Sequence, residues 1–428
     1  MAPHVRREGE LPRPRPHVPL PIERTRPFPY VRRFGGGARR CRVTRADGSH
    51  PQGPLSGVRV VEIASIGPGP FAAMMLADAG ADVVRLERAD ASAGLGSGSW
   101  NQTHRGRPSV GCDLKHPEGR ELALRLCESA DALIEGFRPG VMERLGLGPD
   151  EVLARNPKLV YGRMTGWGQD GPMASQSGHD INYIAIGGVL GAFAREGERP
   201  LFPLNLVGDY GGGAMMLAFG VLAGILNVRS GGEGQVVDAA MVEGSSLLAT
   251  LIRSMADIGM WSDVPGTNLL DSGAHFYEVY ECADGGHFAV GAIEPQFYAE
   301  LLRLLELDPA AFPQLERERW PEFKAAFAEL FMTRTRDEWS EVFEGSEACA
   351  TPVLTFTEAP EHPHNAARGS FVEVGGKLQP GPAPRFSGTP AGEPTPAPEP
   401  GANTDEALAA WGVGADEIAS LRESGAVG

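Results

Sequence analysis

The chain has 428 residues, of which 42% are hydrophobic, so it can bury at least one large core. Its formal net charge of -16 argues against a nucleic-acid partner, because the body of the protein would repel phosphate backbones. The cysteines form no CxxC pair and no cysteine–histidine cluster at metal-ligand spacing. This usage is typical of reduced thiols in a cytosol, so we expect a cytoplasmic protein without a metal site.

The longest apolar stretch runs from residue 211 to 228 and is rich in Gly and Ala. It closely follows Asp209 and is shorter than the roughly 20 apolar residues that span a bilayer. Small residues at helical spacing favour a helix buried in a protein core. No N-terminal segment has the apolar centre of a secretory signal, so we expect no membrane partner.

Residues 1–54 differ in composition from the rest of the chain. Arginine and proline repeat there, and no apolar periodicity could build a core. This pattern predicts a disordered extension. The excess of arginine leaves open a targeting or polyanion-binding arm, and a mis-assigned start is a further explanation.

Strand and helix patterns alternate from Gly57 onward, which predicts βαβ units and an open, Rossmann-like parallel sheet. The turn at 67–70 separates the first strand from the first helix. The expected strands are 57–65, 81–88, 108–115, 131–137 and 158–166, and the expected helices are 71–80, 116–130 and a helical pair in 138–157.

The pattern changes after about residue 232, which indicates a smaller α+β domain. Residues 234–261 predict a strand that runs into a long helix, and 276–292 predict an antiparallel hairpin. A Pro- and Gly-rich extended stretch follows at 378–403, and then two short helices. We expect an extension at 1–54, a large α/β domain at 55–240, a linker helix and small domain at 241–370, and a segment returning to the large domain at 371–428.

Two features follow the predicted strands at the edge where open α/β sheets bind ligands. The turn Gly67-Pro68-Gly69-Pro70 is neither GxGxxG nor a Walker loop, and its prolines remove donors that a phosphate needs. A nicotinamide cofactor is therefore disfavoured. Arg85 and Arg88 stand at the end of the second strand, where a guanidinium can grip a phosphate or lie in solvent.

The hexapeptide GHDINY, from Gly178 to Tyr183, precedes an apolar helical run. This places His179 and Asp180 at a helix N-terminus, where Asp180 is expected to cap the helix and its backbone amide to face an oxyanion. A plain N-cap beside a surface histidine explains the same residues.

Two further sites carry acidic side chains in apolar surroundings. Asn205 and Asp209 lie four residues apart in PLNLVGDYGGG, and burial there would raise the pKa of the carboxyl group. A helix N-cap is an equally good explanation. Glu294 precedes Pro295 and, taken alone, reads as a capping residue.

Six segments together resemble the 2-methylacyl-CoA racemases of the family III CoA-transferase (CaiB/BaiF-like) superfamily. The likeness extends from about Leu55 to residue 390, and only the N-terminal extension departs from it. GHDINY and AIEPQF together separate the racemases from the transferases. The segments are PLSGVRVVEIASIGPGPFAAMMLADAGADVVRLER, EGFRPGVMERLGLGP, GHDINY, PLNLVGDYGGG, GQVVDAAMVEG and AIEPQF.

The resemblance implies a family III CoA-transferase fold, an interlocked homodimer, an acyl-CoA thioester as substrate and no cofactor beyond the CoA of that substrate. Arg88 would hold CoA phosphate. The adenosine end would be lined by Cys112, Asp113, Leu114 and Lys115, and the thioester end by Gly178, His179, Asp180, Ile181, Asn182 and Tyr183. His179 and Asp209 would be the two catalytic bases, supported by Glu294 and Asn205.

Elementary chemistry agrees with those roles. Inverting the carbon next to a thioester carbonyl needs a base on one face of a planar enolate and an acid on the other, with donors for the oxygen. Two rivals remain: a CoA transferase in which Asp209 is the nucleophile, and a noncatalytic CoA-binding paralogue. His179 and Glu294 favour the racemase, and the retained polar groups disfavour the paralogue. Methyl-branched fatty acyl and sterol side-chain substrates both stay open.

Overall fold

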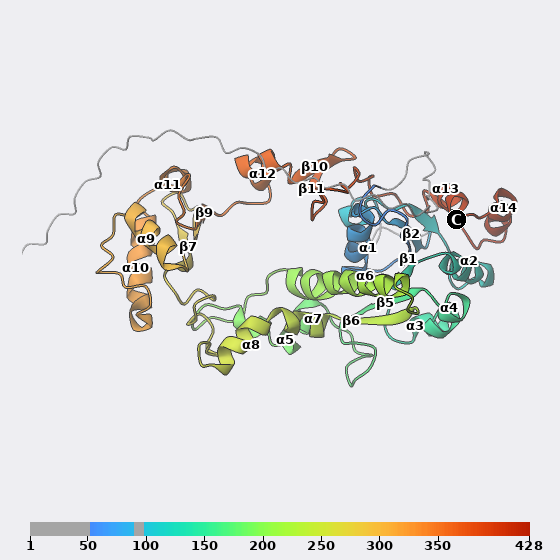
Figure 1. Cartoon of the computed structure of the whole chain (residues 1–428), viewed down its shortest axis with the longest axis horizontal. Helices are drawn as coiled ribbons and strands as arrows, with labels where there is room; N and C mark the ends of the chain where they lie inside the picture. Colours follow the sequence, from blue (N-terminus) through green and yellow to red (C-terminus); the bar gives the residue numbers. More distant parts are fainter. Residues whose placement is uncertain (1–51, 90–97) are drawn as a thin grey trace, which may run out of the picture. The chain divides into compact units, whose positions relative to one another are not determined.

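The computed structural model describes residues 52–89 and 98–428, and its larger sheet has six strands in the order β3-β2-β1-β4-β5-β6. Figure 1 labels β1, β2, β5 and β6 of this sheet. Every neighbouring pair is parallel, as the βαβ pattern predicts. Strand order reverses between β1 and β4, the position where open α/β sheets bind ligands. The strands are β1 Arg59–Ile63, β2 Asp82–Glu87, β3 Ser109–Gly111, β4 Ala132–Glu135, β5 Val160–Thr165 and β6 Gln235–Ala240.

Helices cover both faces of this sheet because its strands are apolar on both sides. Val60 belongs to the core under α1 and α6, whereas the adjacent Val61 belongs to the core under α2 and α4. The helices of this part are α1 Pro68–Asp78, α2 Pro117–Glu128, α3 Val141–Arg144, α4 Pro149–Arg155, α5 Asp180–Ile186, α6 Met215–Arg229, α7 Met241–Leu248 and α8 Thr250–Asp257. The long helix expected after β6 is therefore two helices, α7 and α8.

The GPGP turn starts α1. Gly67 has a φ of 75°, which favours glycine, and Pro68 occupies the first helical position, where its missing N–H breaks no hydrogen bond. The segment thus places the N-terminus of α1 directly after β1.

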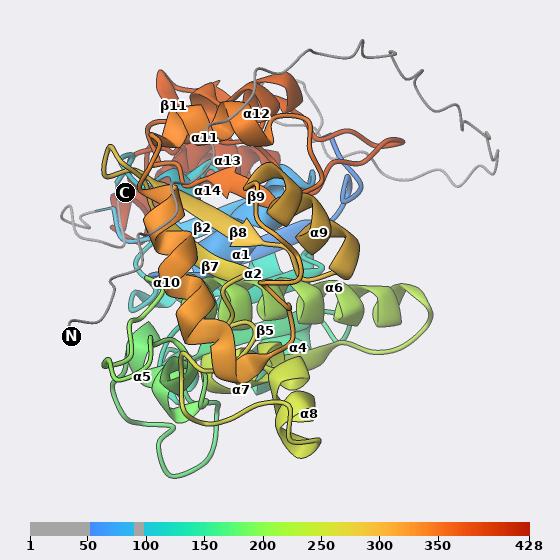
Figure 2. The same ribbon diagram turned by 90° about the vertical axis from the view of Figure 1, so that its left-hand side faces the viewer.

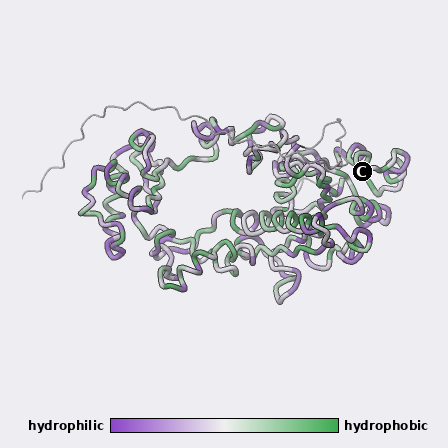
Figure 3. Tube along the Cα trace, viewed as in Figure 1, coloured by the Kyte–Doolittle hydropathy of each residue, from purple (hydrophilic) through white to green (hydrophobic). Residues whose placement is uncertain are grey.

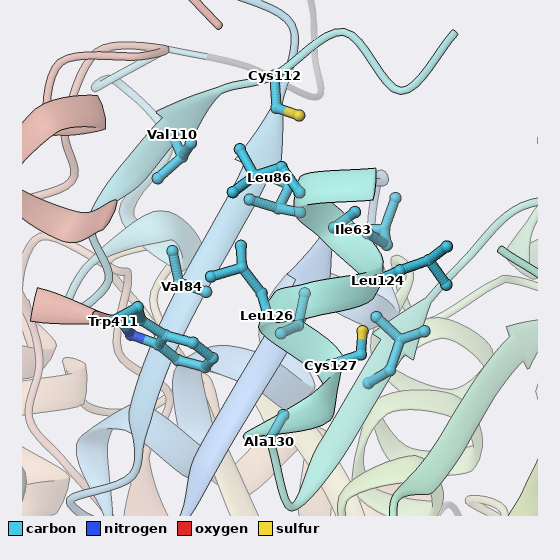
Figure 4. Packing of buried hydrophobic residues seen from close by; sticks show 14 of the residues in the cluster. Ile63, Val84, Leu86, Val110, Cys112, Leu124, Leu126, Cys127, Ala130 and Trp411 are labelled. Carbon is cyan, nitrogen blue, oxygen red and sulfur yellow. The ribbon is translucent and has the colours of Figure 1, made fainter. Parts of the chain in front are cut away.

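The end of the chain packs on the first of these cores. Trp411, which follows α13 (Thr404–Ala410), joins the cluster that contains Val84 and Leu126 (Figure 4). After α14 (Ala415–Glu423), Val427 forms an antiparallel bridge with Cys112.

This pairing corrects the expected strand 108–115, which ends at Gly111. Beyond it the backbone of Asp113 donates to Ala426 O at 2.9 Å, and the Asp113 side chain accepts from Lys115 N–H at 2.9 Å. Cys112 therefore forms an isolated bridge, and the chain turns at Leu114 and Lys115.

A second, antiparallel sheet contains β7 Tyr277–Glu281, β8 His287–Gly291 and β9 Ala350–Pro352 (Figure 2). The predicted hairpin at 276–292 is confirmed. An aromatic-rich core joins this sheet to α9 Pro295–Leu304, α10 Trp320–Phe331 and α11 Arg336–Phe343. The stretch from 378 was expected to be extended chain, but its start belongs to a hairpin of β10 Phe371–Val374 and β11 Lys377–Pro380, after α12 Pro363–Arg368.

The apolar stretch after Asp209 is helical throughout, from Leu206 to Arg229. Its first part, η3 (Leu206–Ala214), is a π-helix, and α6 continues it. Among the described residues this is the one helix long and apolar enough to pass a membrane-span test, with 44% of its apolar window buried. Figure 3 shows the hydrophobic colouring of α6, and Leu217 and Val221 face the core.

Candidate active site

A cavity of about 810 Å³ opens at the carboxyl ends of five neighbouring strands. Its walls follow β1 at residues 63–68, β2 at 86–88, β3 at 112–115, β4 at 136–139 and β5 at 164–167. This is the ligand-binding edge of a doubly wound sheet. The predicted site residues on its wall are Arg88, Cys112, Asp113, Leu114, Lys115, Gly178, His179, Tyr183 and Asp209.

His179 is the N-cap residue of α5. Its backbone N–H donates to Asn182 Oδ1 at 3.1 Å, and its carbonyl accepts from Asn182 N–H at 2.8 Å. These bonds fix the backbone of His179, whereas its exposed side chain lines the cavity. The backbone of His179 is thus held in place, while its side chain is accessible to a bound molecule.

Asp209 lies on η3 and reaches the same cavity. Burial raises the pKa of its carboxyl group, the hydrogen bond from Asn205 lowers it, the charge of Asp180 raises it and that of His179 lowers it, with a net rise. A raised pKa favours a carboxyl group that can hold and deliver a proton. His179 and Asp209 therefore line one cavity and lie close enough for the charge of His179 to act on Asp209.

The sequence predicted that Asp180 caps its own helix, and this prediction is wrong, because His179 occupies the N-cap position. Its buried carboxylate instead accepts from the backbone N–H groups of Gly208 at 2.8 Å and Asp209 at 3.2 Å. Among the described residues no hydrogen-bond acceptor is recorded for the backbone N–H of Asp180 itself. That amide is therefore open to an oxyanion at the N-terminus of α5.

Tyr183 closes the cavity wall beside these residues. Its hydroxyl donates to Gly178 O, and its ring meets Trp167 edge-on at 4.8 Å between centroids. Burial and the nearby charge of Asp209 raise the pKa of Tyr183 to about 12, so the phenol is neutral at physiological pH. A Cβ on Gly166 would lie 2.0 Å from the tyrosine ring, so this packing requires glycine there.

Arg88 and residues 112–115 line the cavity just after β2 and β3, whereas His179 lies in the segment that follows β5. Arg88 and Lys115 are exposed and cationic, which suits phosphate groups. Cys112 is buried, and burial raises its pKa to about 12, so its thiol is unreactive. Arg85, also considered above, instead forms a buried ion pair with Glu62 at 2.5 Å.

Glu294 is the predicted site residue most clearly separated from the others. It is the exposed N-cap residue of α9, beside the second sheet, and its charge acts on Cys349. Within 52–89 and 98–428, no hydrogen bond or ion pair joins it to His179. Ile181, Asn182, Asp180 and Asn205 also lie outside the cavity lining, although Asn205 contacts Asp209.

The cavity includes polar residues that sequence reasoning missed. Arg138 follows β4 and donates to Ser177 Oγ at 2.7 Å, bridging two segments of the wall. Ser65 follows β1, and its buried hydroxyl has no hydrogen-bond partner in the described part of the chain. Arg138 stood in the segment EGFRPG directly after a predicted strand, and that position could have marked it.

A larger cavity of about 1350 Å³ is lined by residues of 187–207, 246–279 and 289–351. None of the residues expected to act in chemistry lines it. We therefore assign the candidate active site to the smaller cavity, which contains both His179 and Asp209.

Comparisons with known proteins identify the family of this chain. Residues 55–404 match the family model for CoA-transferase family III. The alpha-methylacyl-CoA racemase of Mus musculus is 47% identical over 371 residues, which cover 86% of this chain and 96% of the relative. The racemase of that name from Homo sapiens is 43% identical with the same coverage. The crystal structure of a CAIB/BAIF family protein from Brucella suis has a TM-score of 0.70 at 24% identity, covers 84% of this chain and 100% of its own, and supports the fold alone.

Proposed function

The chain belongs to CoA-transferase family III, and we propose that it is a racemase that interconverts (R)- and (S)-2-methylacyl-CoA thioesters. The observation that carries the proposal is the presence of His179 and Asp209 on one cavity at the ligand-binding edge of the sheet. The high identity to two proteins named alpha-methylacyl-CoA racemase supports it. The same reading places the protein in the metabolism of branched acyl chains, which belongs to fatty acid and lipid metabolism.

The reaction passes through an enolate. Neutral His179 removes the α-proton of one enantiomer, and protonated Asp209 delivers a proton to the opposite face of the α-carbon. The roles exchange in the reverse direction. The raised pKa of Asp209, caused first by burial, favours the protonated form that this step needs.

The enolate oxygen requires donors at the moment when it gains charge. The backbone N–H of Asp180, at the N-terminus of α5, is our candidate, since it has no recorded acceptor within the described ranges. Removing such a donor typically costs about 2.7 to 4 kcal/mol of barrier. Proton transfer of this kind consumes no redox equivalent, and we propose that CoA enters only as part of the substrate.

CoA is proposed to lie along the cavity with its phosphates near Arg88 and its adenosine end against residues 112–115. Both cationic groups there, Arg88 and Lys115, are exposed at the rim. The thioester would then reach Gly178 and His179 at the far end of the same cavity. Ile181 and Asn182, which lie outside the lining, would act through the backbone of α5.

We further propose a homodimer, which rests on two observations. Glu294, which we propose supports His179, is the N-cap residue of α9, and α9 packs in a core separate from those of the parallel sheet, so a second copy is a natural source for it. In addition, α6, α7 and α8 expose large apolar side chains, a pattern typical of a protein–protein interface. The most exposed are Met215, Phe219, Leu226, Leu247, Leu248 and Leu251. A cytoplasmic location is proposed on cysteine usage alone.

A CoA transferase is the second candidate, because the family takes its name from that activity. There Asp209 would attack the acyl-CoA and take over its CoA as an aspartyl thioester, which releases the acyl group as a free carboxylate. An acceptor carboxylate would then take the CoA and free Asp209. The decisive experiment incubates one enantiomer of a 2-methylacyl-CoA with the protein in D2O without an acceptor acid. Deuterium at the α-carbon and convergence of both enantiomers on one mixture support the racemase. Absence of exchange, together with CoA transfer to an added carboxylate, would replace it.

A further inference from the structure

The carboxylate of Asp180 links the two elements that carry the proposed proton carriers. Asp180 is the first residue of α5, directly after His179, whereas Asp209 lies on η3. One oxygen, Asp180 Oδ1, accepts from both Gly208 N–H at 2.8 Å and Asp209 N–H at 3.2 Å. The Asp180 side chain, directly after His179 in sequence, thus holds the backbone of Asp209. We call these two hydrogen bonds to Asp180 Oδ1 the tether.

The start of η3 explains why this tether is needed. The first backbone N–H groups of a helix have no partner within the helix, and a π-helix leaves one more than an α-helix does. Asn205, at the N-cap position of η3, provides no side-chain cap, because its amide is directed to the Asp209 side chain. Asp180 supplies the missing acceptor from another element.

The packing around the tether leaves little freedom. The Asp180 side chain is buried, with 6% of its surface exposed, and Gly208 is buried beneath it. A Cβ on Gly208 would lie 2.5 Å from Asp180 Oδ1, too close for any ordinary contact. Glycine at 208 is therefore the residue that allows the carboxylate to reach both N–H groups.

We infer that Asp180 is a positioning residue that sets the distance between His179 and Asp209 across the substrate cavity. This inference rests on the proposed racemase function. It assigns the Asp180 side chain a role separate from that of its backbone amide, since the amide faces the substrate and the carboxylate faces η3. Displacing the reacting groups by about 1 Å can reduce a rate by about a hundredfold, so a loose tether should be costly.

Removing the tether should separate proton exchange from inversion. In Asp180→Ala, Gly208 and Asp209 lose their acceptor, so Asp209 should shift while His179 keeps its own backbone bonds. We expect kcat for racemisation to fall about tenfold to a hundredfold, with KM changed less than about threefold. In D2O, the enantiomer that faces His179 should still gain deuterium, but with retention of configuration.

Asp180→Asn supplies the conservative comparison. Its side-chain oxygen can still accept from both N–H groups, and the buried Oδ2 of the native residue has no hydrogen-bond partner to lose among the described residues. The inversion rate should stay within about threefold of the native rate. The titratable groups around Asp209 are His179, Asp180 and Tyr183. Because the charge of Asp180 raises the pKa of Asp209, the limb of the pH profile due to Asp209 should move to lower pH in Asp180→Asn.

Two further variants control for simple loss of folding. Gly208→Ala pushes against Asp180 Oδ1 without removing it and should reproduce exchange with retention. Asp284 is the matched control, because its Oδ1 also accepts from two backbone N–H groups, those of Gly286 and Arg336, both at 3.2 Å. It lies outside the cavity. Asp284→Ala should lower the melting temperature and leave kcat unchanged.

Two results on inversion would overturn the inference. The first is a native-like inversion rate in both Asp180→Ala and Gly208→Ala. The second is a loss of inversion in Asp180→Asn as large as that in Asp180→Ala. Equal loss of exchange at both faces in a folded variant also overturns it, since His179 would then depend on the same contact. If Asp180→Ala does not fold, Gly208→Ala and Asp180→Asn decide. No exchange in the native protein would instead remove the proposed function.

Discussion

The side-chain amide of Asn205 donates to Asp209 Oδ2 at 3.0 Å, and the two residues are one helical turn apart. The bond stabilises the ionised carboxylate, so it lowers the pKa of Asp209 against the larger effect of burial. Asn205 therefore adjusts how readily Asp209 releases its proton, although it does not itself line the cavity.

Asn205→Ala should move the pH dependence of racemisation. Without the amide donor the pKa of Asp209 rises further, so the limb due to Asp209 shifts to higher pH. A hydrogen bond to a charged group contributes about 1.5 to 3 kcal/mol, so at neutral pH we expect a rate loss of about tenfold or more in the direction in which ionised Asp209 removes the proton. The measurement is kcat across pH 5 to 9, and an unchanged profile would contradict the assignment.

His179→Ala and Asp209→Asn should each abolish racemisation. Each removes the proton carrier on one face of the enolate, and such groups typically contribute about 10² to 10⁴-fold. The two variants should also differ in a specific way, because each should retain slow α-deuterium exchange for the enantiomer that faces the remaining group. Chiral analysis of the recovered thioester in D2O checks this, and full activity in either variant would disprove the two-base assignment.

Arg88→Ala should weaken binding of CoA thioesters without slowing chemistry. Arg88 lies at the cavity rim, where a guanidinium would contact phosphate. Loss of such a contact should raise KM about tenfold or more, with kcat nearly unchanged. Arg155→Ala is a suitable control, since Arg155 pairs with Glu121 and Glu128 at the surface. A raised KM in both variants would indicate a general effect of charge.

Removal of residues 1–51 should leave the activity and melting temperature unchanged. The predicted extension, 1–54, lies almost entirely outside the described residues. Its last part does not: Gln52 O accepts from Gly392 N–H at 3.2 Å, and directly after the extension Leu55 N–H donates to Ala79 O at 2.9 Å. A chain that begins at Ser56 loses both bonds and should melt about 2 °C lower or more. Calorimetry on the two truncations tests this. A large fall in melting temperature on removal of residues 1–51 would show that the extension is part of the folded structure.

Asp209→Asn should stabilise the folded protein at neutral pH. Burial raises the folded pKa of Asp209 above its ordinary value of 3.8, so the unfolded chain ionises first as pH rises. The native protein therefore loses stability between the two pKa values, and the variant does not. Urea unfolding should show a stability gain that grows above pH 4 and then levels off. A stability gain that does not change with pH would contradict a raised pKa of Asp209 in the folded protein.

Glu278 should show the opposite pH dependence. Burial raises its pKa, but ion pairs with Arg195 and Lys324, both at 2.9 Å, outweigh this and lower it. The stabilising contribution of ionised Glu278 is fully present above its ordinary pKa of 4.5. It is lost as the pH falls through the lowered pKa of the folded state. Glu278→Gln should consequently be most destabilising at neutral pH and least at low pH.

The sequence predicted the parallel sheet well because continuous apolar strands and amphipathic helices alternate from β1 to β5. It missed β9, whose three residues, Ala350–Pro352, are too few to show a period. It also extended β3 past Gly111, because the residues that end the strand lie near the other end of the chain. The boundaries expected for the domains stay predictions.

For the candidate site, the motif residues identified the types of group but not their contacts. The spacing placed His179 at a helix start and Asp209 in a half-buried segment, as found. It could not reveal that Asp180 reaches Asp209 N–H from another element, or that Glu294 lies outside the cavity lining. Both are tertiary relations that local pattern does not encode.

The bridge between Cys112 and Val427 also bears on the order of biosynthesis. Gly428 N–H donates to Gly111 O at 2.9 Å, so the cavity wall at residues 112–115 rests on residues that are translated long after it. Contacts of such long sequence separation form late, because loop closure must precede them. The nascent chain can therefore assemble most of its parallel sheet while the proposed nucleotide end of its cavity is still unfinished. Competence to bind a CoA thioester there should then arise only after residues 426–428 have been synthesised.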